Sequence, residues 1–354
     1  MHPARPLVTL KCKLGELDSL CHLRPTGDAH VRLMIELLDS VKPGGRLLPA
    51  LVRAAVSLAS SGQTLWLDTT WLTAASPLAG QPGGVFEYLD DMIESALLEE
   101  LGFMADGLPG LVPVIADDAP DDVLRRVRLL VEHKERDLVI RFGRPPPASE
   151  LVSRIRSIMR LTGTRVGRVH VVLDVGFVEE VRKPQVATVA EVAAAVHDVL
   201  GPGSATVLAG SIPAARTTYA TTTRDRPEVF LWREVRRRVG MIGYGDYGVT
   251  HPVPKSGENA RSPYPYLCYT VPRRTVVLRR RIEKGDLPAE RFADLAEELV
   301  EREDFAGPDF SWGDRELALC RPSGGRAAGS VSRWVSMATS HHLEHVSRRI
   351  PADL

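Results

Sequence analysis

Short apolar runs recur along the first 250 residues, and longer stretches with apolar residues at helical spacing separate them. Each run has the length of a buried strand, and each intervening stretch predicts an amphipathic helix. Alternating strands and helices indicate βαβ units and therefore a parallel sheet. Eight such runs favour an α/β fold of the TIM-barrel type, a closed (β/α)8 barrel, over an open sheet. The runs are LVTLKCK, RLMIELLD, TLWLDTT, LVPVIADD, DLVIRFG, RVHVVLDVG, TVLAGSIP and MIGYGDYG.

The pattern of the sequence changes after Asp246. We expect a barrel over residues 1–250 and a C-terminal α+β elaboration over residues 251–354 that packs on the barrel. Before the change, the Thr-rich segment 214–225 is expected to form an active-site loop or a short helix. The elements expected after it are a loop over 251–265, a β-hairpin over 266–271 and 275–282, and helices over 288–302 and 333–349.

Charge and cysteine content narrow the class of protein. Lys plus Arg equals Asp plus Glu, at 45 each, so the net charge gives no general attraction to nucleic acid or to an anionic membrane. No apolar run is long enough to cross a bilayer, and the N-terminus lacks the pattern of a signal peptide. The four cysteines form no CxxC pair, which argues against a structural zinc cluster and favours reduced thiols. We therefore expect a cytoplasmic protein.

Polar residues stand at or near the downstream end of most of the apolar runs. A parallel barrel carries its chemistry at the C-terminal ends of its strands, so these residues are the candidates for a site. The candidate catalytic residues are Lys11, Glu36, Asp68 and Asp174. The candidate substrate-binding residues are Lys13, Arg141, Ser211, Asp246, Tyr247 and His342.

The three carboxylates follow apolar residues that would hold them rigidly in the sheet. Burial of a carboxylate without a partner is costly, so each of Glu36, Asp68 and Asp174 needs a cation, a metal or a ligand. They suit a general acid/base set or the oxygen ligands of a divalent metal. The alternative is a structural salt-bridge network with Lys11 and Arg141.

The basic candidates suit an anionic partner. Lys11 and Lys13 share a face if both lie on one strand, and their mutual repulsion then favours an anion or a carboxylate between them. The planar fork of Arg141 suits a carboxylate or a phosphate, and a salt bridge to a neighbouring strand is the alternative. Cys12, between the two lysines, would point away from both on a strand.

The remaining candidates lie near the last runs and the C-terminus. Ser211 ends the seventh run, where barrels of this type often bind phosphate, but no GxSxG motif surrounds it. Asp246 and Tyr247 lie on a Gly-flanked turn, where they would orient a ligand or only stabilise the turn. His341 and His345 are spaced to chelate a metal on a helix, whereas surface or interface histidines are the alternative. We expect His342 to close the site together with Asp246 and Tyr247.

Six segments along the chain carry a further signal: LKCKLGELDSL, SIP at 211–213, GDYGVTHP at 245–252, CYT at 268–270, FSWGD at 310–314 and RWVSMATSHHLEHV at 333–346. In their order and spacing these segments resemble the beta family proteins, a group named after a protein of T-even bacteriophages and widespread in bacteria. The similarity covers nearly the whole length. It implies no particular activity and supports only the domain extent and the candidate positions.

These observations predict a barrel enzyme that acts on a small polar or anionic substrate, or on a polar group of a larger molecule. Acid/base or metal-assisted hydrolysis and lyase chemistry both fit, and a divalent metal is the cofactor to test. The alternative is a non-catalytic module that binds a small molecule, a peptide or a partner protein, and the resemblance implies a role in conflict between phage and host. The sequence does not predict an oligomeric state.

Overall fold

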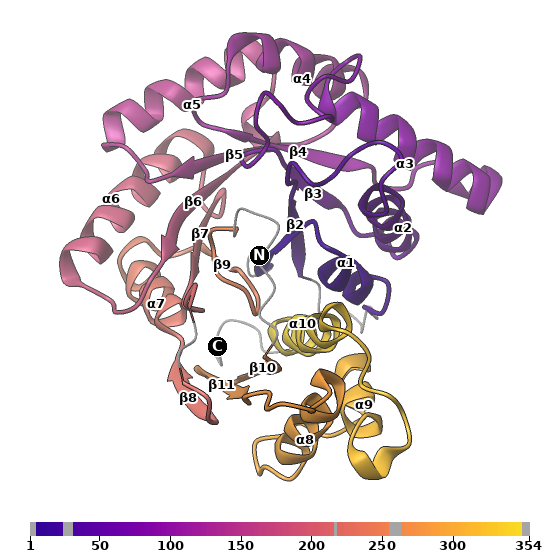
Figure 1. Cartoon of the computed structure of the whole chain (residues 1–354). Coiled ribbons are helices and arrows are strands. Elements are labelled where there is room, and N and C mark those ends of the chain that lie inside the picture. The colour runs from indigo at the N-terminus through magenta and orange to yellow at the C-terminus, as the bar shows by residue number, and fades with distance from the viewer. Residues whose placement is uncertain (1–4, 24–30, 216–217, 255–263, 349–354) are drawn as a thin grey trace.

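The computed structural model describes residues 5–23, 31–215, 218–254 and 264–348. Eight parallel strands close into a barrel with helices on its outer side (Figure 1). This confirms the (β/α)8 architecture, and all eight apolar runs of the sequence form barrel strands. The strands are β1 (Leu7–Lys11), β2 (Arg32–Glu36), β3 (Leu65–Asp68), β4 (Leu111–Ala116), β5 (Leu138–Gly143), β6 (Val169–Phe177), β7 (Ala205–Gly210) and β9 (Gly243–Asp246).

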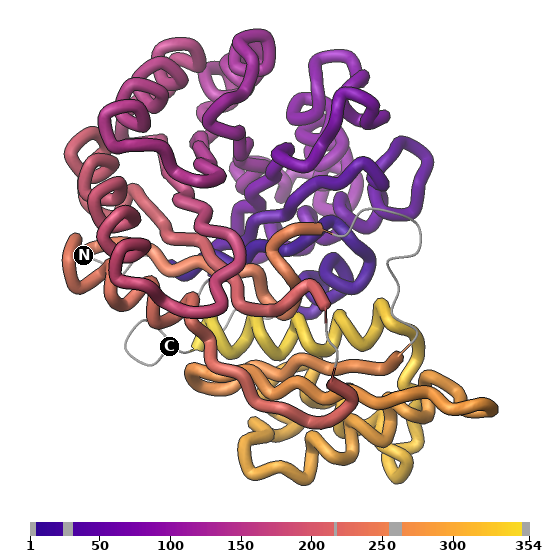
Figure 2. Tube along the Cα trace, turned by 60° about the vertical axis from the view of Figure 1, so that its left-hand side comes forward, coloured from indigo at the N-terminus to yellow at the C-terminus, as the bar shows by residue number. Residues whose placement is uncertain are grey.

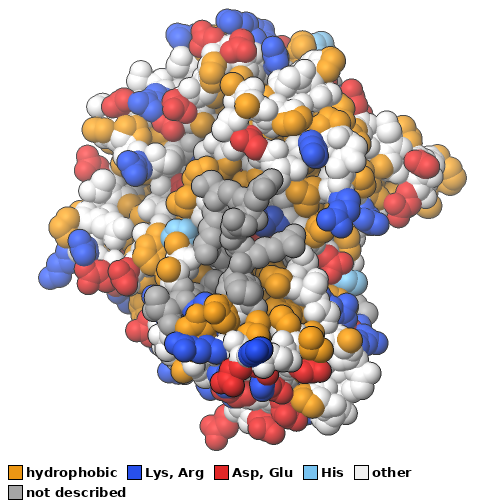
Figure 3. Space-filling view, in the orientation of Figure 1, with side chains coloured by type: hydrophobic (Ala, Val, Ile, Leu, Met, Phe, Trp, Pro, Cys, Tyr) orange, Lys and Arg blue, Asp and Glu red, His pale blue; other side chains and the backbone are white. Residues whose placement is uncertain are grey.

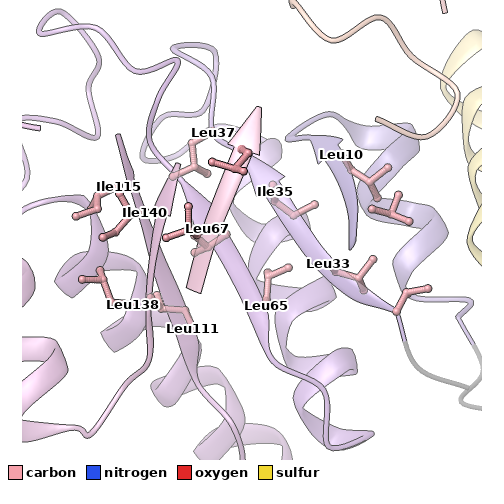
Figure 4. Packing of buried hydrophobic residues seen from close by; sticks show 14 of the residues in the cluster. Leu10, Leu33, Ile35, Leu37, Leu65, Leu67, Leu111, Ile115, Leu138 and Ile140 are labelled. Atoms are coloured by element: carbon pink, nitrogen blue, oxygen red, sulfur yellow. The ribbon is translucent and has the colours of Figure 1, made fainter. Parts of the chain in front are cut away.

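Alternation along each strand separates two apolar layers. On β1 to β3, Leu10, Ile35 and Leu67 face outward into the layer under the helices, which Figure 4 shows from close by. Leu7 and Met34 point into the barrel, where a smaller apolar cluster fills the lower interior. Successive side chains of a strand point alternately into and out of the barrel. The polar residue that ends a strand therefore points in one of these two directions, according to its place in the alternation.

Helices surround most of the barrel, and the eighth position is taken by a helix from the C-terminal end. The last helix, α10 (Val331–Arg348), packs against the first one, α1 (Leu14–Leu20). The others are α2 (Leu47–Ser60), α3 (Val85–Leu101), α4 (Asp121–His133), α5 (Ala148–Thr162), α6 (Lys183–Leu200) and α7 (Pro227–Val239), with short 3-10 turns at Gly102–Ala105, Val166–Arg168 and Pro322–Gly324.

The C-terminal region adds a three-stranded sheet to the barrel. The hairpin of β10 (Tyr266–Val271) and β11 (Arg274–Arg279) pairs with β8 (Thr222–Asp225), which lies between β7 and α7 in the chain. The prediction of a loop or short helix over 214–225 was therefore wrong for its last four residues. In Figure 2, α10 lies between the barrel and this sheet, and α8 (Pro288–Val300) and α9 (Trp312–Leu319) lie below it.

Two glycines allow α10 to approach its neighbours closely. A Cβ atom on Gly15 of α1 would clash with the carbonyl oxygen of Ser332, and one on Gly313 of α9 would clash with that of Met337. Both glycines belong to segments that resemble the beta family, LKCKLGELDSL and FSWGD. Close helix packing is thus a physical reason for these motifs.

The surface carries charges of both signs, and Figure 3 shows them interspersed over one face of the molecule. None of the helices formed by the described residues is long and apolar enough to cross a bilayer.

Candidate active site

Six side chains meet inside the barrel at the C-terminal ends of its strands. Three of them come from adjacent strands in direct register, because Lys11 pairs with Glu36 and Glu36 with Asp68. Each side chain points inward, since it keeps the parity of the interior residues below it. We call this group the mouth cluster; it consists of Lys11, Glu36, Asp68, Arg141, Asp174 and Tyr247.

Arg141 of β5 is the centre of the mouth cluster. Its guanidinium binds Glu36 at 2.8 Å, forms an ion pair with Asp68, and reaches Asp174 at 2.7 Å through Nη2 and at 3.1 Å through Nε. The same Nη2 donates a hydrogen bond of 2.7 Å to the hydroxyl of Tyr247. One arginine therefore joins three carboxylates and a phenol that come from four other parts of the chain.

A small residue on the neighbouring strand leaves room for this arrangement. Ala116 of β4 is the register partner of Arg141 and belongs to the inward-facing parity of β4. Its methyl group is short, so the arginine can extend past β4 to Asp68 on β3. A larger side chain at this position would occupy the path of the guanidinium.

The other members are held by short hydrogen bonds. The Nζ atom of Lys11 binds Glu36 at 3.0 Å, and the indole N–H of Trp71 donates to the second oxygen of Glu36 at 2.9 Å. Thr70 donates to Asp68 from its backbone N–H at 2.9 Å and from its hydroxyl at 2.6 Å. The four carboxylate oxygens of these two acids are therefore all engaged.

Asp174 differs from the other carboxylates because it reaches the surface. Its side chain is 12% exposed, whereas Glu36 and Asp68 are fully buried. An irregularity in the pairing of β6 with β7 follows Asp174, and the N–H of Gly176 donates to its Oδ1 at 2.9 Å. Gly176 adopts a φ of 71°, a conformation that favours glycine.

The pKa values of the two fully buried acids, Glu36 and Asp68, are shifted in opposite directions. Although burial alone would raise it, the adjacent Lys11 and Arg141 hold the pKa of Glu36 below its usual value. Burial raises the pKa of Asp68 despite the attraction of Arg141, and the negative charge of Glu36 adds to the rise. The cluster holds three carboxylates against two cations, so one proton in it is electrostatically favoured. Of the two fully buried acids, Asp68 holds a proton more readily than Glu36, because its pKa is raised and that of Glu36 is lowered.

The residues present do not fit a divalent metal. Every oxygen of Glu36 and Asp68 already accepts from a cation or a hydrogen-bond donor, and Arg141 lies where a metal bound by the three acids would lie. Among the described residues, no group of three or more His, Cys, Asp or Glu side chains is arranged to hold a metal ion. The three carboxylates that were predicted as possible metal ligands thus bind the guanidinium of Arg141.

The histidine motif has a structural role. His341 is buried, with Nδ1 at 2.9 Å from Asp314 and Nε2 at 2.7 Å from the carbonyl oxygen of Thr270. Both ring nitrogens are engaged, so the prediction of a metal site with His345 finds no support here. The thiol of Cys12 is buried on the outer side of β1, and this burial raises its pKa, which opposes a catalytic thiolate.

Two predicted binding residues lie outside the mouth cluster. Strand β1 ends at Lys11, so Lys13 does not continue its inward face; it precedes α1 and is exposed. The shared face predicted for the two lysines is therefore absent. Ser211 follows β7 and is buried, and within the described residues its side chain has no hydrogen bond to the cluster.

Asp246 and His342 lie in a second buried group, on the outer side of the barrel. Asp246 accepts hydrogen bonds from Arg226 at 2.9 Å and from Tyr244 at 2.7 Å, and its other oxygen lies 3.0 Å from Nε2 of His342. The opposite nitrogen of His342 is 2.8 Å from the hydroxyl of Thr270 on β10. We call this group the junction cluster; it consists of Arg226, Glu228, Tyr244, Asp246, Thr270 and His342.

The prediction that Asp246 and His342 close the site with Tyr247 was therefore wrong for two of the three residues. Asp246 ends β9 and has the outward parity of Tyr244, whereas the next residue, Tyr247, turns into the barrel. Among the described residues, no hydrogen bond or ion pair joins the junction cluster to the mouth cluster. The junction cluster instead connects the barrel to the second sheet and to α10.

Sequence reasoning missed several residues that hold these clusters. Trp71 and Thr70 follow Asp68 directly in TLWLDTTW, so their closeness to a candidate carboxylate was a usable signal. Arg226 and Glu228 bind each other at 2.8 Å at the start of α7. No local pattern distinguished these two residues from an ordinary helix terminus.

The Beta protein family matches residues 7–348, which is nearly the whole chain. The chain belongs to the Beta protein family. This confirms the resemblance that its motifs suggested. No curated protein matches the chain.

Solved structures give only distant similarities. Bifunctional proline utilization A (PutA) is 13% identical with a TM-score of 0.37, over 70% of this chain and 26% of its own. A mutant of atrazine chlorohydrolase TrzN from Arthrobacter aurescens TC1, complexed with zinc and atraton, is 10% identical with a TM-score of 0.36. That match covers 68% of this chain and 50% of the other, so the chain spans at most half the length of either protein. The fold assignment above comes from the strand topology alone.

Proposed function

We propose that this member of the Beta protein family is a barrel enzyme that performs acid/base chemistry on a small polar or anionic substrate at the C-terminal mouth of the barrel. The observation that carries the proposal is the mouth cluster, in which three carboxylates share two cations within hydrogen-bonding distance. Hydrolysis and lyase chemistry both need a proton donor and a proton acceptor close to each other, and this group supplies both.

The excess of acids favours this proposal over a purely structural network. A buried ion-pair network contributes little stability even when its charges balance, because desolvation offsets the attraction. Here the charges balance only when one carboxyl is protonated, and the raised pKa of Asp68 makes it a candidate for that carboxyl. Perturbed acids of this kind are typical of functional sites.

The exposed fraction and the contacts of each side chain in the mouth cluster indicate its role. Asp174 is the carboxylate that would meet a substrate, as base or as hydrogen-bond acceptor, because it reaches the surface. Asp68 would hold the proton, and Arg141, which contacts both acids, would couple their charges. An anionic group of the substrate would compete with Asp174 for the Nε and Nη2 edge of Arg141, which presents two parallel donors. Lys11 and Glu36 would hold that arginine in place.

The test compares Asp174→Asn with a matched control, Asp117→Asn. Asp117 follows β4 at the same end of the barrel, its side chain is also 12% exposed, and it pairs with Arg154 rather than with the mouth cluster. Each purified protein is incubated with a defined mixture of polar carboxylates and phosphate esters, and mass spectrometry measures which compounds disappear. Incubation in water labelled with oxygen-18 then separates hydrolysis, which incorporates the label, from lyase chemistry.

We expect the wild-type protein and Asp117→Asn to consume the same compound, and Asp174→Asn to be slower by roughly 10²–10⁴-fold, the usual contribution of a general acid or base. An unchanged rate in Asp174→Asn would contradict the proposal. If all three proteins bind the same compounds but consume none of them, the chain is a binding module instead.

A further inference from the structure

Arg279, the last residue of β11, is a buried cation with no acidic partner among the described residues. Only 8% of it is exposed, and its guanidinium forms no ion pair with another described residue. Two other described arginines are buried at least as deeply, Arg141 and Arg226, and each binds at least two carboxylates. A buried charge normally has such a partner, because desolvation without one is costly.

Aromatic rings cover part of this cation. The guanidinium carbon of Arg279 lies 4.3 Å from the ring centre of Tyr219 and 5.6 Å from that of Tyr264. Arg281 adds a second guanidinium 4.7 Å from the Tyr219 ring, and the two rings pack edge to face with centres 5.1 Å apart. Cation–π contacts of this kind stabilise a charge only partly.

Within the part of the chain that the structure describes, one hydrogen-bonding nitrogen of Arg279 is unused. Its Nη1 atom is buried and has no hydrogen-bond partner among these residues. The acid that lies near this end of the sheet, Glu298, is already bound by Arg280 and by the hydroxyl of Thr221. An unsatisfied, buried, charged donor costs more than an ordinary buried polar group, so an occupant with negative charge would remove a large penalty.

We propose that Arg279, Arg281, Tyr219 and Tyr264 form a second binding site, which takes the phosphate or carboxylate group of a small molecule. Its residues belong to β11, to the chain that leaves it, and to the segments that precede β8 and β10, so the site is built on the second sheet rather than on the barrel strands. The bound oxyanion accepts from Nη1 of Arg279 and balances the charges of both arginines. The tyrosine rings hold the two guanidinium groups in position.

The experiment uses inorganic phosphate and acetate as probes of the full-length protein, with sodium chloride at equal ionic strength as the reference. Calorimetric titration measures binding, and urea denaturation measures stability with and without each anion. The test variant is Arg279→Met, which keeps an apolar stem against the rings. The matched control is Arg291→Met, which removes the same charge from α8, where Arg291 is exposed and pairs with Asp286 and Asp294.

We expect saturable binding of phosphate, acetate or both to the wild-type protein and to Arg291→Met. The dissociation constant should rise at least about tenfold in Arg279→Met, which loses a charge-assisted hydrogen bond. Without the anion, Arg279→Met should be at least as stable as the wild-type protein; with the anion, the order should reverse, because only the wild-type protein gains from binding. The response to the two probes separates phosphate from carboxylate preference.

Three results would overturn the proposal. The first is that neither anion binds the wild-type protein more strongly than chloride does. The second is equal affinity in the wild-type protein and Arg279→Met. The third is an Arg279→Met protein that fails to fold in anion-free buffer, since that would show a stabilising role without any ligand. Arg281→Gln, at an exposed position, provides an independent variant that should weaken binding roughly threefold, because it removes one of the two charges.

Discussion

The mouth cluster and the junction cluster are both buried polar groups centred on an arginine, yet they differ in exposure. The junction cluster joins Arg226 to Asp246 and Glu228, with His342 as a further partner of Asp246, and these side chains are only 2–4% exposed. In the mouth cluster one of the three acids, Asp174, reaches the surface with 12% of its side chain exposed. Full burial suits a structural connection, whereas a group of acids and cations with an exposed member suits proton transfer with a substrate.

Adjacent residues of one strand end contribute to these two different groups. Asp246 and Tyr247 follow each other at the end of β9, but one points out of the barrel and the other into it. A position at the C-terminal end of a barrel strand is therefore not sufficient to place a residue in the site. What matters is the direction of the side chain. A residue that points into the barrel joins the mouth cluster, and one that points outward joins the junction cluster.

The largest effect should come from Arg141→Met. Removal of this cation leaves three carboxylates close together, and we expect the free energy of unfolding to fall by about 3–5 kcal/mol in urea denaturation at pH 7. The matched control is Arg154→Met, at a position 37% exposed, where the loss should stay below about 1 kcal/mol.

The loss in Arg141→Met should also depend on pH. Burial already raises the pKa of Asp68, and without Arg141 it rises further, so the folded variant binds protons more readily than its unfolded chain. Its deficit relative to the wild-type protein should shrink as the pH falls from 8 to 5. A deficit independent of pH would show that the carboxylates do not interact as described.

Asp246→Asn should have the next largest effect, in the junction cluster. Although burial would raise it, His342 and Arg226 hold the pKa of Asp246 below its usual value. The ionised carboxylate therefore stabilises the folded state above the unfolded-state pKa of about 4, and this contribution is lost as the pH falls through the folded-state pKa. We expect a loss of about 2–3 kcal/mol at pH 7 that narrows below pH 4.

Turnover measured on the same variants distinguishes the roles of the two clusters. Asp246→Asn should keep the turnover of any substrate found for the wild-type protein, once corrected for the fraction folded. A loss of turnover as large as that of Asp174→Asn would place the junction cluster in the catalytic machinery and remove the distinction drawn here.

The smallest effect should come from Thr270→Val, which is nearly isosteric. It removes the hydroxyl that binds Nδ1 of His342 and should cost about 1 kcal/mol in urea denaturation. Trp71→Phe is its counterpart in the mouth cluster, since it removes the indole N–H that binds Glu36. The comparison is refuted if Thr270→Val lowers turnover while Trp71→Phe leaves it unchanged.

Much of the barrel was predictable because its signals are local. Each strand is a short apolar run, and each helix has its own apolar face, so neither needs distant residues to be recognised. Strand β8 was missed because it is only four residues long and polar, although its two threonines favour a strand. It forms because β11 offers it an edge, and that edge comes from a hairpin about 50 residues further along the chain.

The sequence by itself determined the eight-stranded barrel and the convergence of Lys11, Glu36, Asp68, Arg141 and Asp174, because strand order and alternation place strand ends together. Only the tertiary structure decided that Asp246 and His342 connect the barrel to the second sheet, that Lys13 lies outside the cluster, and that Arg279 is buried with no acidic partner among the described residues. These outcomes depend on where each strand ends and on which surfaces meet across long sequence separations. No local pattern of residues records either.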